Sequence, residues 1–179
     1  MRKWLVISYN LPTEPSRIRV AAWRGLRKQG AVNIQKSLWV LPYSEGNYSV
    51  LATLAEELEN NNGDVIIMES VFFEEKYEQK IISIYNKART LEYEEIIDKC
   101  NDFFVEIEKE TIKENLTFAE AEENEEELNK LLSWFNKINV RDIFDAPHKE
   151  ETETALEKCK KVFEEFHTKV FDKEAQERT

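Results

Sequence analysis

Hydrophobic residues follow two different spacings along this chain. Up to residue 73 they form short runs, several with an alternating pattern, and turn-forming residues separate these runs. Beyond that point they recur at intervals of three and four, the spacing of one helix face. All four glycines and three of the four prolines lie before residue 64. We therefore expect short strands and helices in front, long helices behind, and a boundary near Phe73.

The front part is predicted to contain four strands and two helices. The strands are expected over residues 3–10, 31–37, 38–43 and 64–73, and the helices over 16–29 and 48–61. Ser16 is expected to cap the first helix, and Gly30 to end it. The order β-α-β-β-α-β is that of the ferredoxin-like arrangement. The predicted fold class is thus α+β, with a ferredoxin-like unit over 1–73 and an α-helical half over 74–179.

The helical half contains three apolar stripes, each suited to packing against another helix. Their members are Tyr93, Ile97, Cys100, Phe104 and Ile107; Leu128, Leu131, Phe135 and Ile138; and Leu156, Cys159, Phe163, Phe166 and Val170. Thr117 and Glu120 have capping-box spacing for the middle helix, and Pro147 suits the first turn of the last. Long antiparallel helices, packed as a bundle or arm on the front unit, are therefore expected.

Charge is distributed unevenly. Residues 1–41 hold eight Lys or Arg against one acid, Glu14, a charge of +7, which leaves −18 for the rest of a chain whose total is −11. Two interpretations remain open: a local anion site, or a basic end that docks on an acidic surface. A chain this acidic overall is a poor general nucleic-acid binder.

Five of these eight basic residues lie on the first predicted helix. At about 100° per residue, Arg17, Arg24 and Lys28 share its outer side. Arg19 falls next to Trp23, within the apolar sector. Together with free amide groups at the helix start, Arg17 and Arg19 would form an oxyanion cradle.

The structural alternative is that Arg19 pairs with a carboxylate, such as Glu69 or Asp142, and joins the two halves. We favour that pairing over a ligand site, because inward-facing arginines are usually paired. Trp23 and Trp39 could stack on bases, but their positions favour the core.

Recognisable catalytic and metal-binding motifs are missing from the sequence. There is no nucleophile elbow, phosphate-binding loop, His-Glu-x-x-His helix or dinucleotide fingerprint. Two histidines and two distant cysteines, Cys100 and Cys159, do not suggest a zinc site, and the cysteines are expected to be small buried hydrophobes. The glutamate-rich segment 120–127 is predicted to be a solvated helix face. No catalytic residue, metal or cofactor is predicted.

The sequence also predicts the compartment. No stretch approaches the roughly 20 apolar residues of a membrane span. The apolar run at the N-terminus stops at Ser8 without a cleavage site. We expect a cytoplasmic protein that does not enter membranes.

Four segments together carry a family resemblance. They are Pro15-Ser16-x-x-Arg19-Val20-x-x-Trp23-Arg24-x-Leu26-Arg27-x-x-Gly30-Ala31, Leu38-Trp39-Val40-Leu41-Pro42, Lys87-Ala88-Arg89-x-x-Glu92-Tyr93 and Arg141-Asp142-x-Phe144-x-Ala146-Pro147. Along nearly its whole length the chain resembles the N-terminal domain family of the chromate-resistance protein ChrB. The resemblance implies a bacterial protein tied to chromate resistance. The resemblance also implies that longer relatives are chromate-responsive transcriptional regulators with a further, C-terminal sensing domain. We expect this chain to lack that domain and to be a partner or a remnant of the regulator.

A second, narrower resemblance concerns the front unit. The segment Gln35-Lys36-Ser37-Leu38-Trp39 is similar to the second strand of Cas2-type units, which recur in PaaX-type repressors. Nucleases of that type hold a metal with an aspartate at the end of their first strand, where this chain has Ser8-Tyr9-Asn10. A neutral amide is a weak magnesium ligand. A metal-dependent nuclease is therefore the least favoured hypothesis.

The preferred hypothesis is a non-enzymatic regulatory or binding protein whose basic first helix contacts an anion. Chromate, sulfate and a DNA backbone are the candidate ligands, and an acidic partner face is the other candidate. A regulator that binds DNA directly through this helix is the main alternative, and a homodimer is expected by analogy with other ferredoxin-like units. The predicted contact residues are Arg17, Arg19, Arg24 and Lys28, and the predicted supports of the joint between the halves are Trp23, Arg89, Arg141 and Asp142.

Overall fold

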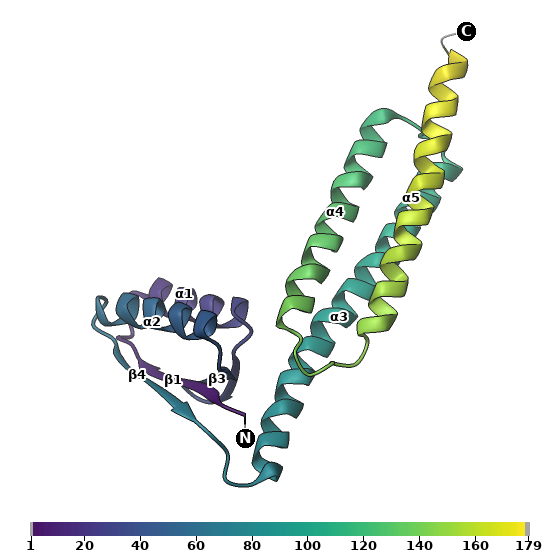
Figure 1. Cartoon of the computed structure of the whole chain (residues 1–179). Helices are drawn as coiled ribbons and strands as arrows, with labels where there is room; N and C mark the ends of the chain where they lie inside the picture. Colours follow the sequence, from purple (N-terminus) through teal and green to yellow (C-terminus); the bar gives the residue numbers. More distant parts are fainter. Residues whose placement is uncertain (1, 178–179) are drawn as a thin grey trace. The chain divides into compact units, whose positions relative to one another are not determined.

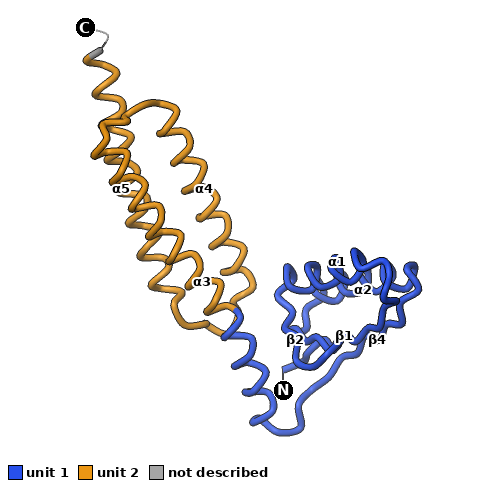
Figure 2. The backbone as a smooth tube through the Cα atoms, turned by 180° about the vertical axis from the view of Figure 1, so that it is seen from behind, with its two compact units in different colours: residues 1–88 blue, residues 89–179 orange. Residues whose placement is uncertain are grey.

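The computed structural model describes residues 2–177 and confirms the predicted α+β class (Figure 1). A four-stranded sheet with two helices comes first, and three long helices follow. The chain divides into two compact units, residues 1–88 and 89–179, and the division falls inside helix α3 (Figure 2). The last strand ends at Ser70 and α3 begins at Glu75.

The first unit has the predicted ferredoxin-like order of elements. Its strands, all paired antiparallel in the order β2-β3-β1-β4, are β1 (Trp4–Asn10), β2 (Val32–Gln35), β3 (Leu38–Pro42) and β4 (Asp64–Ser70). Its two short helices are α1 (Ser16–Lys28) and α2 (Glu45–Glu59). The central position of β1 follows from its sequence, because Trp4 through Ile7 are all buried, as expected of a strand covered on both faces.

The alternation of side chains along β1 creates two apolar faces. Leu5 and Ile7 pack with Leu26 of α1 and Leu51 of α2, which cover one face of the sheet. Trp4 points to the other face, where its ring meets Phe72 edge-on at 5.9 Å. Its indole Nε1 donates a hydrogen bond of 2.9 Å to Glu78 in the first turn of α3. A buried Trp that finds a polar partner satisfies its N–H group without losing apolar contact.

Several helix ends differ from the predictions. Ser16 does not cap α1: it is the first helical residue, Pro15 holds the cap position, and no side chain caps the helix. Helix α2 begins earlier than expected, because the Ser44 side chain accepts a 3.0 Å bond from the Asn47 amide. Gly30, with a φ of 88°, ends α1 as predicted.

The second unit is built from the part of α3 (Glu75–Ile112) that begins at Arg89, from α4 (Phe118–Arg141) and from α5 (Lys149–Glu177), and successive helices run antiparallel (Figure 1). The capping box of α4 is confirmed, since Thr117 Oγ1 accepts from the Glu120 amide at 3.3 Å. Pro147 lies outside α5, in the turn before it, and not in its first turn as predicted.

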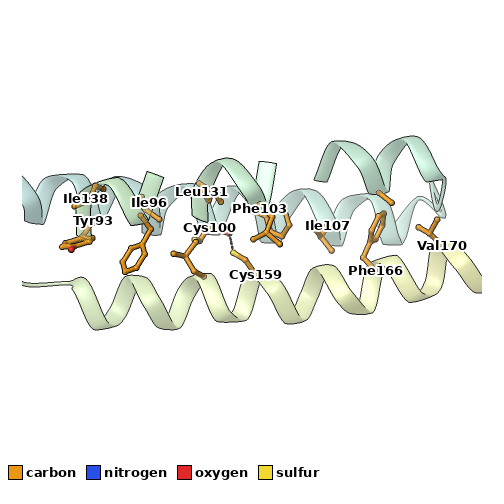
Figure 3. Packing of buried hydrophobic residues seen from close by; sticks show 14 of the residues in the cluster. Tyr93, Ile96, Cys100, Phe103, Ile107, Leu131, Ile138, Cys159, Phe166 and Val170 are labelled. Atoms are coloured by element: carbon orange, nitrogen blue, oxygen red, sulfur yellow. Dashed lines mark hydrogen bonds between the residues drawn. The ribbon is translucent and has the colours of Figure 1, made fainter. Parts of the chain in front are cut away.

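The core of the helical unit confirms the predicted α4 stripe in full and the other two in part, since Phe163 of the α5 stripe is only partly buried (Figure 3). On α3 the fully buried positions include Ile96 and Phe103, while the predicted Ile97 and Phe104 are only half-buried. The observed and the predicted positions have the same helical spacing but are shifted by one residue. Which of the two is buried depends on where the neighbouring helices pack. Cys100 and Cys159 are buried as expected and not disulfide-bonded, and the Cys159 thiol lies 4.0 Å from the Cys100 carbonyl oxygen.

Candidate anion-binding face of the first helix

Helix α1 carries five Lys or Arg residues and no acid. Arg17, Arg24 and Lys28 are exposed on its outer side, as predicted. Arg19 is exposed too, although its position in the sequence placed it in the apolar sector. The reason is that the fully buried sector of α1 is narrow, with only Ala22 and Leu26 in it, so position 19 lies at its border. We call Arg17, Arg19, Arg24 and Lys28 together the basic face of α1; the first, third and fourth share its outer side, and Arg19 lies about 160° around the axis from Arg17, at the border of the buried sector.

The carboxylates expected to neutralise Arg19 are engaged elsewhere. Glu69 pairs with Lys3, whose Nζ lies 2.8 Å from the carboxylate. Asp142 accepts hydrogen bonds inside the helical unit. Within the described part of its own unit, residues 2–88, no residue of the basic face makes an ion pair. A pairing of Arg19 with Glu69 is therefore not found, while a pairing with Asp142, which lies in the other unit, stays a prediction.

The start of α1 adds to this positive potential. No side chain caps its first amide groups, and its first turn contains no acid. Unsatisfied amide groups and the helix dipole favour negative charge at this end. Arg17 and Arg19 stand in the same turn but about 160° apart around the axis, so an anion bound by both would have to lie over the end of the helix. The sequence signal for this feature was the run Ser16–Val20, with two arginines where acids are normally favoured.

Trp23 is not a core residue, contrary to prediction, whereas Trp39 is. Trp23 is 45% exposed and Trp39 only 5%. The guanidinium of Arg27, one turn later on α1, lies 5.0 Å from the centre of the Trp23 ring, a cation–π contact. Val20 on the same helix is 42% exposed. The outer surface of α1 thus combines apolar side chains with basic ones.

The predicted supporting residues Arg89 and Arg141 meet in the helical unit. Arg89 Nε lies 2.6 Å from one carboxylate oxygen of Glu92, and Arg141 Nη2 lies 3.1 Å from the other. Arg89 is buried, so this shared carboxylate offsets a costly buried charge. Glu92 was not among the predicted site residues, and its spacing of three from Arg89 was the signal for it.

Asp142 organises the neighbouring polar contacts. Its side chain accepts a 3.0 Å bond from the Tyr93 hydroxyl and a 3.0 Å bond from the Ala146 amide. Burial first, and then the hydrogen bond to Asp142, raise the pKa of Tyr93 above its ordinary 10.0. These contacts link α3 to the turn between α4 and α5. The role of Arg89, Arg141 and Asp142 at the joint between the halves stays a prediction, since the partners named here all lie in the helical unit.

Two kinds of feature were sought among the described residues: clusters of metal-ligating side chains and helices that could span a bilayer. Over residues 2–177 no three His, Cys, Asp or Glu side chains come together in a way that could hold a metal ion. None of the described helices combines the length and the apolar character that a bilayer crossing requires. The glutamates at positions 122, 123, 125 and 126 are exposed on α4, as a solvated face should be.

Comparison with known proteins places the chain in a family. The model of the N-terminal region of protein ChrB matches residues 19–177, which is most of the chain and begins at Arg19. This chain belongs to the ChrB N-terminal family. Protein ChrB of Cupriavidus metallidurans is 28% identical over 92 residues, a stretch that covers 51% of this chain and 28% of that protein. The chain thus matches less than a third of this curated relative, and no solved structure matches it.

Proposed function

We propose that this chain is a non-enzymatic regulatory or binding protein linked to chromate resistance, and that it docks an anionic partner on the basic face of α1. The observation that carries the proposal is the free state of that face. Its four cations are exposed, and none makes an ion pair within the described part of its unit. Membership in the ChrB N-terminal family supports the link to chromate resistance, which is the property associated with that family.

The dimensions of the basic face favour an extended anion. Arg17 and Lys28 are eleven residues apart, a rise of about 16 Å along the helix axis. A single tetrahedral oxyanion is much smaller than this and would reach only a subset, such as Arg17, Arg19 and the uncapped amides. A row of negative charges, such as a phosphate backbone or an acidic protein surface, would reach Arg17, Arg24 and Lys28 together along the outer side of the helix.

Calorimetric titration of the full chain separates these cases. The probes are chromate and sulfate as single oxyanions, and linear polyphosphate as an extended one, at matched ionic strength. The test variant neutralises the basic face by Arg17→Gln, Arg19→Gln, Arg24→Gln and Lys28→Gln. The matched control removes the same charge from exposed lysines elsewhere, by Lys87→Gln, Lys137→Gln, Lys161→Gln and Lys169→Gln.

We expect polyphosphate to bind more tightly than sulfate, and the basic-face variant to lose at least tenfold in affinity while the control keeps most of it. Equal affinities for the two variants would refute the docking face, because bulk charge alone would then explain binding. Negligible heat with all three probes for the wild type would refute the proposal outright.

A second candidate, direct binding to DNA, is favoured by the exposed Trp23 beside the cations. An aromatic ring among arginines can stack on bases while the arginines hold phosphates. Affinity should then fall steeply with salt, and each removed phosphate contact should lower the slope of log K against log salt by about 0.9. Gel shifts at two salt concentrations with wild type and the basic-face variant test this. Identical salt slopes for the two proteins would exclude it.

A further inference from the structure

The two edges of the sheet are built differently. The edge strand β2 has only four residues, and its pairing with β3 shifts register between Asn33 and Gln35. The Asn33 side chain also donates hydrogen bonds to the Lys36 and Leu38 carbonyl groups, so these two acceptors already have a partner within the chain. The opposite edge strand β4 has seven residues in regular register with β1, and no other strand of the described residues pairs with it. Irregular, short edges resist strand addition, whereas long regular ones invite it.

Strand β4 also exposes apolar side chains. Val65 and Ile67 pack toward the core under α1 and α2, so Ile66 and Met68 point to the opposite face. There they are 55% and 44% exposed. The strand has no Lys, Arg or Pro, and its two charged residues, Asp64 and Glu69, lie toward its ends and leave the centre apolar. In the segment that follows β4, Phe73 is fully exposed and Val71 nearly half exposed.

We propose that β4 pairs antiparallel with β4 of a second copy of this chain, about a two-fold axis that passes through Ile67. Antiparallel pairing of identical strands is self-complementary, as a two-fold interface requires. With Ile67 on the axis, Ile66 of each copy faces Met68 of the other on the same side of the sheet. Cross-strand apolar pairs of this kind stabilise a sheet.

The charges of β4 are compatible with this register. Asp64 would face Ser70 of the second copy, and Glu69 would face Val65, so no two acids stand opposite each other. Glu69 is in addition neutralised by Lys3 of its own chain. Moving the axis to Ile66 or Met68 would break the Ile66–Met68 pair and set one of these side chains against itself. The Ile67 register alone brings both exposed apolar residues together.

Strand pairing by itself is a small interface. A stable dimer usually buries about 800 Å² on each partner. The exposed side chains of Val71 and Phe73 lie directly after β4 in the chain and provide further apolar surface for the contact. The result would be one continuous sheet of eight strands across the two copies.

The mass of the full chain in solution tests the existence of the dimer. By analytical ultracentrifugation we expect a species of twice the 21.2 kDa chain mass. The double variant Ile66→Lys with Met68→Lys would place like charges opposite each other and should raise the dissociation constant at least tenfold. Val140→Lys, at an 80% exposed position of α4, is the matched control and should leave the dimer intact.

Cross-linking tests the register independently of any folding defect in the lysine variant. A cysteine at position 67 would face the cysteine at position 67 of the second copy. The two Cα atoms would be about 4.5–5.5 Å apart, a distance that a disulfide can bridge. Copper–phenanthroline in air supplies the oxidant, taking two electrons and two protons from each pair of thiols. Ile67→Cys should form a covalent dimer, and Asn33→Cys on the β2 edge should not. A monomer at every concentration would overturn the proposal, and so would a dimer that survives both lysines and leaves Ile67→Cys uncrosslinked.

Discussion

Replacement of Asp142 by alanine should strongly destabilise the helical unit. Asp142 is buried and accepts from two donors, the Tyr93 hydroxyl and the Ala146 amide. Alanine would leave both donors in a buried site without their acceptor, at about 1–3 kcal/mol each. We therefore expect the free energy of unfolding to fall by about 3 kcal/mol. Asp142→Asn keeps an acceptor of the same shape and should cost about 1 kcal/mol.

Urea denaturation followed by circular dichroism at 222 nm measures this loss. The matched control is Asp102→Ala on α3, where the exposed carboxylate pairs, among the described residues, with Lys99 alone at 2.9 Å. A surface pair of this kind contributes less than about 1 kcal/mol. A double-mutant cycle with Tyr93→Phe should give a coupling of about 1 kcal/mol or more, since the two groups share one hydrogen bond.

The reasoning would be refuted if Asp142→Ala cost no more than Asp102→Ala. It would also be refuted by additive effects of Asp142→Ala and Tyr93→Phe, because the hydroxyl and the carboxylate would then act independently.

Three further predictions follow from buried and exposed side chains. Because the pKa of Tyr93 is raised in the folded chain, the unfolded chain loses the hydroxyl proton near pH 10 while the folded chain keeps it. The Tyr93 hydroxyl therefore contributes to the free energy of unfolding below pH 10, and this contribution is lost as pH rises above 10. Tyr93→Phe should make the loss of stability above pH 10 shallower in denaturation curves taken from pH 8 to 11, and parallel curves would contradict the assignment. Both cysteines should resist a thiol reagent such as dithionitrobenzoate in the native protein and react fully in urea; rapid reaction of either native thiol would show that the core is open. Trp39→Ala should cost about 3–5 kcal/mol and Trp23→Ala less than about 1, and equal costs would contradict their different burial.

The order of elements in the first unit could be read from the sequence because its breakers are well placed. Gly30 and the segment Asn62-Gly63 end the two helices, and Pro12 and Pro15 separate the first strand from α1. The errors concern phase and border positions. Ile96, and not Ile97, is fully buried because both positions fit the helical spacing, and only the packing of the neighbouring helices determines which one faces the core. Arg19 and Trp23 lie where the buried sector of α1 ends, and no periodicity fixes the width of that sector.

The polar contacts of the helical unit were only partly predictable. Arg89, Arg141 and Asp142 stood out as charged residues inside the family motifs. Glu92 did not, although it lies in one of those motifs, and Tyr93 was predicted as a core residue but not as a hydrogen-bond partner of Asp142. Arg141 and Glu92 are 49 residues apart, and only the antiparallel return of α4 brings them within 3.1 Å. Such long-range pairings need the helix packing, which a single sequence does not specify.

The central claim is that the cations of α1 are available to a partner, and amide chemical-shift mapping of the ¹⁵N-labelled full chain tests it most directly. On titration with linear polyphosphate, we predict that the largest shifts lie at Arg17, Arg19, Arg24 and Lys28 and their neighbours on α1, that they saturate, and that they disappear in the variant with four glutamines on this face. Shifts of equal size over the acidic helices, or an unchanged response in that variant, would contradict the account.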